Sequence, residues 1–459
     1  MTSSVERSLV ITGADVLIDG QVEKGVTIVV EDGLIVSLSG RVGPGVEGPG
    51  EAEVADPATA MPPNQTVIDG SGLLAMPGLI NSHTHAAMTL LRGVAEDVGV
   101  DSWFNDFVWP IETNVTPDDV RLGTELACAE MIQGGITSFA DHYFHEANAA
   151  LAVADSGLRA NLGCTFFTSD DTNDLQTSIE FAQEWHGAEG GRITTSLAPH
   201  APYTCSDDEL KAAASAARQL GIKVHLHAAE HREQTESSLQ RRGVTPIAVL
   251  EDTGVLDAGA IIGHGCGILD RDLPILASYS DRVGIAHCPK VYLKHGLDRL
   301  TPIRELRDCG VAVGLGTDGP AGCNSIDGFE AMRLTAMTQK HLERDATWLT
   351  MADVLEMAGP LSAATIGVNA GAIKVGAKAD IILVDLGGLH CQPLHDPLAA
   401  LIYSIRASDV RTTIVDGRPL MVDRQLLTID IAELTKRVKG RGPQLASTTH
   451  NSPQRRYEL

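Results

Sequence analysis

Histidines and carboxylates recur in this sequence just after short apolar stretches. The first such pair is His83 and His85, which follows the apolar segment AMPGLIN. If that segment is a β-strand, a spacing of two residues places both imidazoles on the same face. Two neutral imidazoles on one face can chelate zinc or another borderline divalent metal. The pair therefore predicts a metal site; the alternative is two surface histidines in a turn.

A second group of polar residues follows the apolar segment KVHLHAA. His227 lies near the end of this segment, and Glu230 comes three residues later. A carboxylate beside a metal-ligating histidine could carry protons to and from a substrate, although it could also mark the start of a helix. His225 faces the same side as His227 by the period-two rule. We expect His225 to be a hydrogen-bonded group deeper in the fold.

Three further residues stand in similar positions elsewhere in the chain. Asp318, in GLGTDG, could complete a set of three histidines and one aspartate and accept a proton from metal-activated water; alternatively, it caps the next segment. His264, in IIGHG, could be a metal ligand, a partner of the nucleophilic water or a hydrogen-bonded core residue. His200, in APHAPY, could contact a substrate or serve the structure.

The elements that must position these residues alternate regularly. Between about residues 70 and 345, apolar strand-like segments alternate with helical ones, and eight such units can be counted. This α/β pattern indicates a parallel sheet, and eight units indicate a closed (β/α)8, or TIM-like, barrel. Catalytic groups of such barrels collect at the carboxyl ends of the strands. The polar residues above are predicted to lie at that end.

Short alternating strands precede and follow the predicted barrel, which indicates a small β-sandwich domain built from both termini. We expect four segments: residues 1–68 for the N-terminal part of this domain, 69–370 for the catalytic barrel, 371–440 for its C-terminal part and 441–459 for a polar tail, disordered at its end.

Composition excludes several classes of partner. The chain has 459 residues, with 60 acidic against 35 basic side chains and a formal net charge of −25. Nucleic acids and anionic membranes both require positive charge facing them, so neither is an expected partner. No signal peptide or run of about 20 apolar residues is visible. We therefore expect a reduced, cytoplasmic protein in which the eight cysteines act as small buried hydrophobic residues.

Taken together, the motifs resemble those of the amidohydrolase superfamily. PGLINSHTH resembles its first-strand motif, and HAAE, IIGH and GTDG follow in the family's order. The resemblance implies a metallo-dependent hydrolase barrel holding one divalent metal, usually zinc or iron, with the ligands His83, His85, His227 and Asp318. It also implies that Glu230 carries a proton to a ring nitrogen and that His264 helps to hold the hydrolytic water. Two-metal relatives commonly use a carboxylated lysine on the fourth strand, and RITTSLAPH contains none.

Within this superfamily the chain resembles the branch of 5'-methylthioadenosine/S-adenosylhomocysteine deaminases and, more distantly, the triazine hydrolases. The similar segments are THAAMTLLRGVAEDVGVDSWFNDFVWPIE, YFHE, GRITTSLAPHAPYTCS and GTDG with EAMRLTAMTQK. The resemblance implies that Glu112 grips a ribose, that His200 contacts the substrate and that Trp103 forms part of the pocket wall. It implies hydrolytic deamination of an amino-substituted nitrogen heterocycle, such as an adenosine-type nucleoside, a purine or a pterin. Many relatives are homo-oligomers, and we expect one here.

The sequence also departs from that branch. Cys164 and Asp174 stand near the positions where the nucleoside deaminases carry arginines, and Gly322-Cys323 replaces the usual serine and asparagine. The usual PxSN motif is replaced by a segment in which Lys290 and Tyr292 could contact a different edge of the substrate or face solvent. We expect structural roles for three other histidines: His142, His145 and His287.

Other activities remain open from the sequence. One alternative is a triazine-type hydrolase that expels chloride or an alkylamine. Cyclic-amide hydrolysis is disfavoured by the missing lysine in RITTSLAPH. A non-catalytic scaffold is disfavoured because no expected metal ligand is missing.

Overall fold

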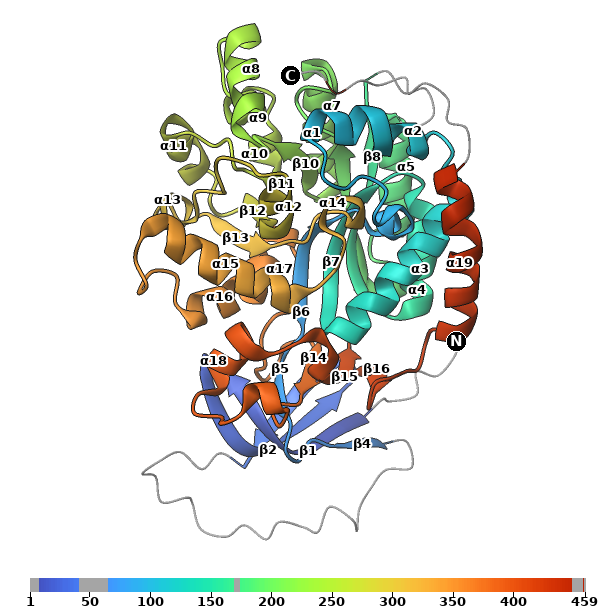
Figure 1. The fold of residues 1–459 in the computed structure, drawn as a ribbon, viewed down its shortest axis with the longest axis vertical. Coiled ribbons are helices and arrows are strands. Elements are labelled where there is room, and N and C mark those ends of the chain that lie inside the picture. Colours follow the sequence, from blue (N-terminus) through green and yellow to red (C-terminus); the bar gives the residue numbers. More distant parts are fainter. Residues whose placement is uncertain (1–7, 41–64, 169–173, 448–456, 458–459) are drawn as a thin grey trace.

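The computed structural model describes residues 8–40, 65–168, 174–447 and 457. Eight parallel strands, in the order β13 to β6, form a nearly closed barrel surrounded by helices (Figure 1). The strands are β6 (Leu79–Thr84), β7 (Ile136–Tyr143), β8 (Arg159–Phe166), β9 (Ile193–Pro199), β10 (Val224–Ala228), β11 (Ala260–His264), β12 (Gly284–His287) and β13 (Ala312–Leu315). The predicted barrel is confirmed.

The barrel strands are apolar because both of their faces are covered. Every residue of β7, β8, β10, β11 and β12 is buried, as expected for parallel strands between a packed interior and a layer of helices. The two end strands meet at the site: the backbone N–H groups of Thr317 and Asp318, just after β13, donate to the carbonyl of His83 in β6.

Some of the helices begin at capping residues that the sequence provides. Thr116 with Asp119, and Ser206 with Glu209, form capping boxes at two of them. The helices that follow the first barrel strands are η1 (Ala86–Leu91), α1 (Val100–Ser102), η2 (Trp103–Val108), α2 (Trp109–Glu112), α3 (Pro117–Gly134), α4 (Glu146–Ser156), α5 (Leu175–Trp185), α6 (Ala188–Gly191) and α7 (Asp207–Leu220). Those after β10 are α8 (Arg232–Arg242), α9 (Pro246–Asp252), α10 (Val255–Ala258), η3 (Asp270–Asp272), α11 (Leu273–Ala277), α12 (Pro289–Lys294), α13 (Ile303–Asp308), α14 (Pro320–Cys323), α15 (Gly328–Glu343), α16 (Met351–Ala358) and α17 (Pro360–Ile366).

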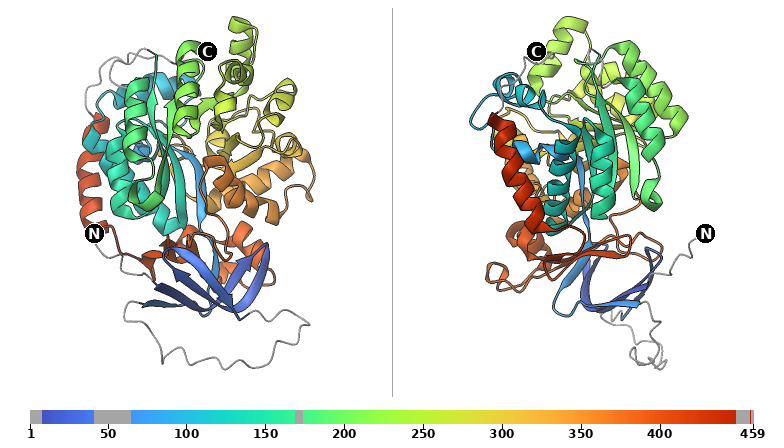
Figure 2. Two further views of the ribbon diagram at one scale, coloured as in Figure 1. Left: turned by 180° about the vertical axis from the view of Figure 1, so that it is seen from behind. Right: turned by 90° about the vertical axis from the view of Figure 1, so that its right-hand side faces the viewer.

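A separate nine-stranded mixed sheet is built from both ends of the chain (Figure 2). Its strands are β1 (Ser8–Ile18), β2 (Gln21–Glu31), β3 (Leu34–Ser39), β4 (Gln65–Asp69), β5 (Leu74–Pro77), β14 (Ile381–Val384), β15 (Val410–Val415), β16 (Arg418–Val422) and β17 (Gln425–Leu426). β5 lies between β1 and β14 and so joins the two halves. The sheet has its own apolar core, which includes Ile11, Ile28 and Ile381.

The sheet is fixed to the amino-terminal end of the barrel by a buried ion pair. Arg159, the first residue of β8, donates from Nε and Nη2 to the two carboxylate oxygens of Asp380, at 2.7 and 3.1 Å. Asp380 immediately precedes β14, and its carboxylate also accepts from the backbone N–H of Asp416. Short helices η4 (Leu389–Cys391), α18 (Pro397–Ala399), η5 (Ala400–Ser404) and η6 (Ala407–Asp409) complete this region.

The last helix returns along the side of the barrel. α19 (Ile431–Ser447) runs alongside α3 (Figure 1) and is tied to it by a bidentate pair between Arg441 and Asp119. It extends beyond the boundary expected at residue 440. Most of the expected polar tail, residues 448–456, 458 and 459, lies outside the described residues. No described helix is both long and apolar enough to cross a membrane.

Candidate active site

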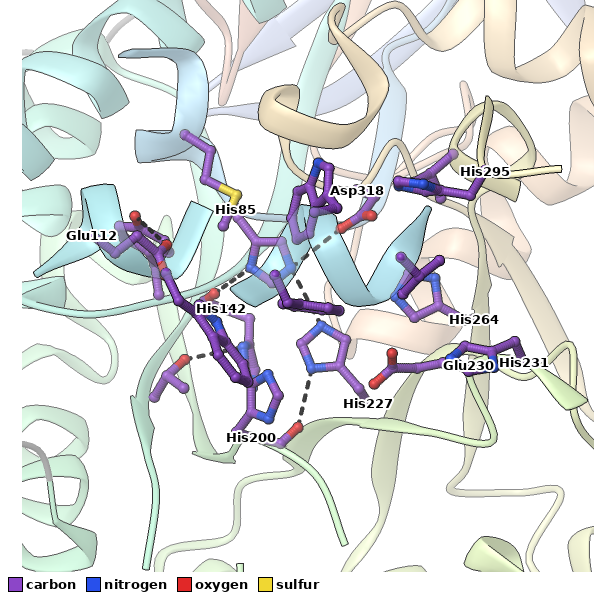
Figure 3. A pocket seen from close by; sticks show the side chains of 18 of the residues that line it. His85, Glu112, His142, His200, His227, Glu230, His231, His264, His295 and Asp318 are labelled. Atoms are coloured by element: carbon purple, nitrogen blue, oxygen red, sulfur yellow. Dashed lines mark hydrogen bonds and ion pairs between the residues drawn. The ribbon is translucent and has the colours of Figure 1, made fainter. Parts of the chain in front are cut away.

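Histidine nitrogens and one carboxylate meet at the carboxyl end of the barrel (Figure 3). His83 lies in β6, His227 in β10 and His264 at the end of β11, while His85 and Asp318 follow β6 and β13. Asp318 Oδ1 lies 3.2 Å from His85 Nε2 and 3.7 Å from His83 Nε2. His227 Nε2 lies 3.3 Å from His85 Nε2. The structure therefore brings together all four residues predicted to be metal ligands.

The outer ring nitrogens of these histidines fix which nitrogen faces the centre. Nδ1 of His85 donates to the carbonyl of His142 at 2.5 Å, and Nδ1 of His227 donates to the carbonyl of His200 at 3.0 Å. In neutral rings, the Nε2 lone pairs of His85 and His227 then point toward each other. Facing lone pairs repel unless a cation lies between them, and carbonyl acceptors behind metal-ligating histidines are common.

The Nδ1 atom of His83 is also held from behind, but its partner is another histidine rather than a backbone carbonyl. Its Nδ1 lies 2.8 Å from His225 Nε2, so His225 is hydrogen bonded, as expected for it. Its buried Nε2 has no hydrogen-bond partner among the described residues. An unpaired buried nitrogen is costly. Coordination of a metal would remove that cost, and the donor set therefore fits a divalent cation.

The electrostatics of the cluster differ between His85, which lies beside the Asp318 carboxylate, and the other histidines. Burial lowers the pKa of His83, His227 and His264. Although burial opposes it, the hydrogen bond from His85 leaves the pKa of Asp318 below its usual value. Burial also disfavours charge on His85, but the hydrogen bond and charge of Asp318 outweigh it and raise the pKa of His85. A positive charge is thus favoured here, and a metal ion would displace the proton.

Two of the site residues have left-handed backbone conformations. His264 has a φ angle of 77° and Asp318 one of 65°. Non-glycine residues rarely adopt such angles, and each costs of order 1 kcal/mol or more. The surrounding contacts hold this strain at His264, whose carbonyl accepts from the hydroxyls of Thr301, at 2.7 Å, and Tyr292, at 3.4 Å.

Glu230 extends into the same pocket from the segment after β10 (Figure 3). Its Oε1 accepts a hydrogen bond of 3.3 Å from the hydroxyl of Tyr203, a contact that no sequence motif predicts. Its position beside His227 gives the carboxylate access to a molecule held over the donor cluster. It can therefore exchange protons with a substrate without being a ligand itself.

The pocket walls are mainly aromatic. Trp103, Phe104, Trp109, Phe144 and Phe167 all line it. Such walls provide flat apolar surfaces for a planar ring.

Two predicted substrate contacts, Glu112 and His200, also line the pocket. Glu112 Oε1 accepts from the hydroxyl of Tyr143 at 2.7 Å, and His200 stacks on Phe167 with ring centres 4.5 Å apart. The indole of Trp103, the third predicted contact, donates to the carbonyl of Ala321 at 3.3 Å. These side chains are held in place by neighbours, as a preformed site requires.

The structure places Lys290 away from the pocket lining. Its amino group binds Ser325 Oγ at 2.7 Å and Glu330 Oε2 at 2.6 Å, and it does not line the pocket. The charged side chain of Lys290, on α12, pairs with a carboxylate of α15. Sequence spacing could not predict this ion pair. Tyr292 does line the pocket, but its hydroxyl supports the His264 backbone.

His142 was expected to be structural, but it lines the pocket. Its Nδ1 is hydrogen bonded to Thr165 Oγ1 at 3.0 Å, and its buried Nε2 has no hydrogen-bond partner among the described residues. His295, which no sequence motif singled out, lines the pocket too. His287 fits its expected role, since its Nδ1 is hydrogen bonded to Thr301 Oγ1 at 2.9 Å.

Cys164 and Asp174, which stand near the positions where the nucleoside deaminases carry arginines, supply no positive charge. Cys164 is buried in β8, and burial raises its thiol pKa to about 12. Asp174 caps α5 by accepting from the backbone N–H of Thr177 at 2.8 Å. Within the described part of the chain, no lysine or arginine lines the pocket.

Comparisons with known proteins agree with this geometry. A model described as the amidohydrolase family matches residues 74–420. The chain therefore belongs to the amidohydrolase family, whose members are metal-dependent hydrolases.

Particular relatives narrow the comparison. The chain is 41% identical to a 5-methylthioadenosine/S-adenosylhomocysteine deaminase of Pelotomaculum thermopropionicum over 81% of this chain and 86% of that protein. A zinc-bound adenosine deaminase of Xanthomonas campestris has a similar structure, with a TM-score of 0.88 and 30% identity, covering 96% of this chain and 99% of that one. Atrazine chlorohydrolase of Arthrobacter aurescens, solved with zinc, shares the fold at 23% identity, with a TM-score of 0.81 over 95% and 100% of the two chains.

Proposed function

We propose that this protein is a zinc-dependent deaminase that removes the amino group of an adenine nucleoside by hydrolysis and releases ammonia. The observation that carries this proposal is the placement of Glu230, a carboxylate free of the donor cluster but facing the same pocket. The deaminase names of its relatives support the same reaction. The proposed ligands of a single ion are His83, His85, His227 and Asp318; iron is the alternative metal.

Each residue would have a defined part in the reaction. The bound zinc ion would supply a nucleophilic water at neutral pH. Glu230 delivers a proton to the ring nitrogen next to the attacked carbon, so that negative charge does not build up in the ring. His264 and Asp318 orient the water, and Asp318 accepts its proton. Asp318 returns that proton to the amino group, which leaves as ammonia, while the added hydroxyl gives its proton to Glu230 as the ring carbonyl forms.

The sugar would lie toward Glu112. Glu112 and Glu230 stand on opposite sides of His85 in Figure 3, so a purine over the donor cluster would place its sugar away from Glu230. The Glu112 carboxylate, already held by Tyr143, can accept hydrogen bonds from sugar hydroxyls. His200 and the aromatic walls would enclose the base.

The pocket further favours a nucleoside with an uncharged 5' group. A homocysteine tail carries a carboxylate and an ammonium group, and among the described lining residues no lysine or arginine is present to pair with the carboxylate. A charged group that loses its pairing costs about tenfold or more in affinity. We therefore expect adenosine and methylthioadenosine to be better substrates than S-adenosylhomocysteine, by at least about tenfold in kcat/KM.

The decisive experiment measures ammonia release by zinc-loaded protein from these three nucleosides at equal concentration. Rapid release from adenosine or methylthioadenosine is expected, with about one zinc ion per chain by elemental analysis. No ammonia from any of them, in a protein that has bound zinc, would refute the deaminase proposal. Assays for chloride and alkylamine release from triazines would then test the alternative reaction.

Two further expectations belong to this proposal. Two metal ions per chain would instead support cyclic-amide hydrolysis, and light scattering in solution tests whether the chain forms the expected homo-oligomer. We expect the enzyme to be cytoplasmic, and fractionation of the source cells can test this.

A further inference from the structure

Tyr457, near the end of the chain, is buried against the wall of the pocket. Its exposed fraction is 1%. Its ring stacks on Phe104, with ring centres 4.6 Å apart and an angle of 14° between the planes. Its hydroxyl lies 2.5 Å from Nε2 of His231. A tyrosine in a polar tail thus has the contacts of a core residue.

The backbone of Tyr457 is also held in place. Asn105 Nδ2 donates to its carbonyl at 3.0 Å, and its own N–H donates to Asn105 Oδ1 at 2.8 Å. One side-chain amide therefore pairs with both backbone groups of the tyrosine. Two such bonds together with a stacked ring define a specific docking position rather than a chance contact.

The residues that Tyr457 contacts belong to two separate segments of the pocket wall. Phe104 lies in η2, which follows the first barrel strand, and His231 follows Glu230 after the fifth. Both side chains line the pocket. His231 Nδ1 donates to Glu233 Oε2 at 3.0 Å, so its Nε2 accepts from the tyrosine hydroxyl.

We propose that Tyr457 is a positioning residue of the substrate pocket, which joins Phe104 to His231 and thereby sets the affinity for substrate. It does not itself line the pocket, so it acts through these two neighbours. Its ring edge also meets Tyr203, the donor to Glu230, with ring centres 5.8 Å apart. The carboxyl-terminal end of the chain thereby contributes to a site otherwise built by barrel strands and loops.

The test uses full-length, zinc-loaded protein and rests on the proposed function for its kinetic part. We expect Tyr457→Ala to raise KM for methylthioadenosine about tenfold, because a stacked ring and a hydrogen bond are lost. Tyr457→Phe keeps the ring and should raise KM only about threefold. In both variants kcat should change less than about twofold, because the donor cluster and Glu230 remain. Tyr403→Ala, which removes a half-exposed tyrosine of η5, is the matched control and should change neither constant.

A second variant reaches the same contact from the other side. Asn105→Ala removes both hydrogen bonds to the Tyr457 backbone, and it should raise KM in the same direction. If the two residues act together, the double variant should be no worse than Tyr457→Ala alone. An unchanged KM in Tyr457→Ala, Asn105→Ala and the double variant would overturn the proposal. A loss of kcat as large as the rise in KM would also overturn it. So would changes in KM that merely follow a general loss of protein stability.

Hydrogen exchange separates this inference from the proposed reaction. Backbone amides of residues 100–110 and 230–235 should exchange faster in Tyr457→Ala and Asn105→Ala than in wild type or Tyr403→Ala. This measurement needs no substrate, so it holds even if the protein proves not to be a deaminase. Unchanged exchange in both segments would overturn the positioning role whatever the reaction.

Discussion

The two ends of the barrel treat buried polar groups in opposite ways. At the amino-terminal end, the Arg159 guanidinium and the Asp380 carboxylate form two hydrogen bonds, and a backbone N–H adds a third. At the carboxyl end, the Nε2 atoms of His85 and His227 face each other at 3.3 Å. One end completes its polar pairs within the chain, whereas the other gathers histidine nitrogens that a divalent cation would bridge.

Backbone strain is present at both ends: at the amino-terminal end Asp416, whose N–H donates to Asp380, has a φ angle of 51°. His264 and Asp318 hold left-handed conformations at the carboxyl end. Parallel strands bring their last residues to one rim, so loops there can vary without disturbing the packed barrel. This barrel therefore holds a stabilising ion pair at one end and the candidate active site at the other. Variants at each end should separate stability from turnover.

The largest expected effect is on turnover, at the carboxyl end. Glu230→Gln should lower kcat about a thousandfold, within the range of 10²–10⁴ typical of a lost general acid–base group. Zinc content and the unfolding midpoint should stay at wild-type values, because Glu230 lies outside the donor set. Steady-state kinetics with elemental analysis measure both. Glu236→Gln, on the exposed face of α8, is the control for lost charge; unimpaired turnover in Glu230→Gln would remove Glu230 from the mechanism.

The next effect is on stability, at the amino-terminal end. Arg159→Met leaves the buried Asp380 carboxylate without its guanidinium, and it should lower the free energy of unfolding by about 3–5 kcal/mol. Below the unfolding transition, kcat should be nearly unchanged. Denaturant unfolding and kinetics at low temperature measure the two quantities.

A surface pair provides the matched control for that variant. Arg437 binds both oxygens of Glu125 at 2.6 Å, but its side chain is 42% exposed. Arg437→Met should cost less than about 1 kcal/mol. Equal losses in the two variants would contradict the view that burial makes the Arg159 pair important.

The sequence predicted the barrel and the donor cluster because both depend on local patterns. An apolar segment that ends in a polar residue predicts both a buried strand and a functional side chain at its end. His83 in β6 and His264 in β11 are examples. Residues that depend on side-chain packing between distant segments were not predictable in this way. Lys290 pairs with Glu330, and Tyr203 reaches Glu230, through contacts that no spacing rule contains.

Tyr457 shows the same limit most clearly. A polar composition predicts disorder for a chain end, yet this one aromatic residue is buried more than 200 positions from His231 in the sequence. An aromatic side chain in a polar tail was the available signal. Its docking surface, however, is formed only when η2 and the segment after β10 come together.

The smallest expected effect is the pH dependence of stability, and it sharpens the comparison at the carboxyl end. Burial, and then the neighbouring His264, lower the pKa of His287 to about 3. An unfolded histidine has a pKa of about 6.5. Between these values the unfolded chain binds a proton that the native state does not, so the free energy of unfolding falls as the pH drops from about 6.5 toward 3. Each such group contributes up to about 1.4 kcal/mol per pH unit.

His287→Gln should therefore make the plot of unfolding free energy against pH shallower between pH 6.5 and 5, by up to about 1.4 kcal/mol per unit. Urea unfolding of metal-free protein at several pH values measures this slope. His341→Gln, at an exposed position of α15, is the control and should leave the slope as in wild type. Identical slopes in wild type and His287→Gln would mean that acid destabilises the protein elsewhere, and that the buried histidines of the carboxyl end do not make it the acid-sensitive end of the barrel.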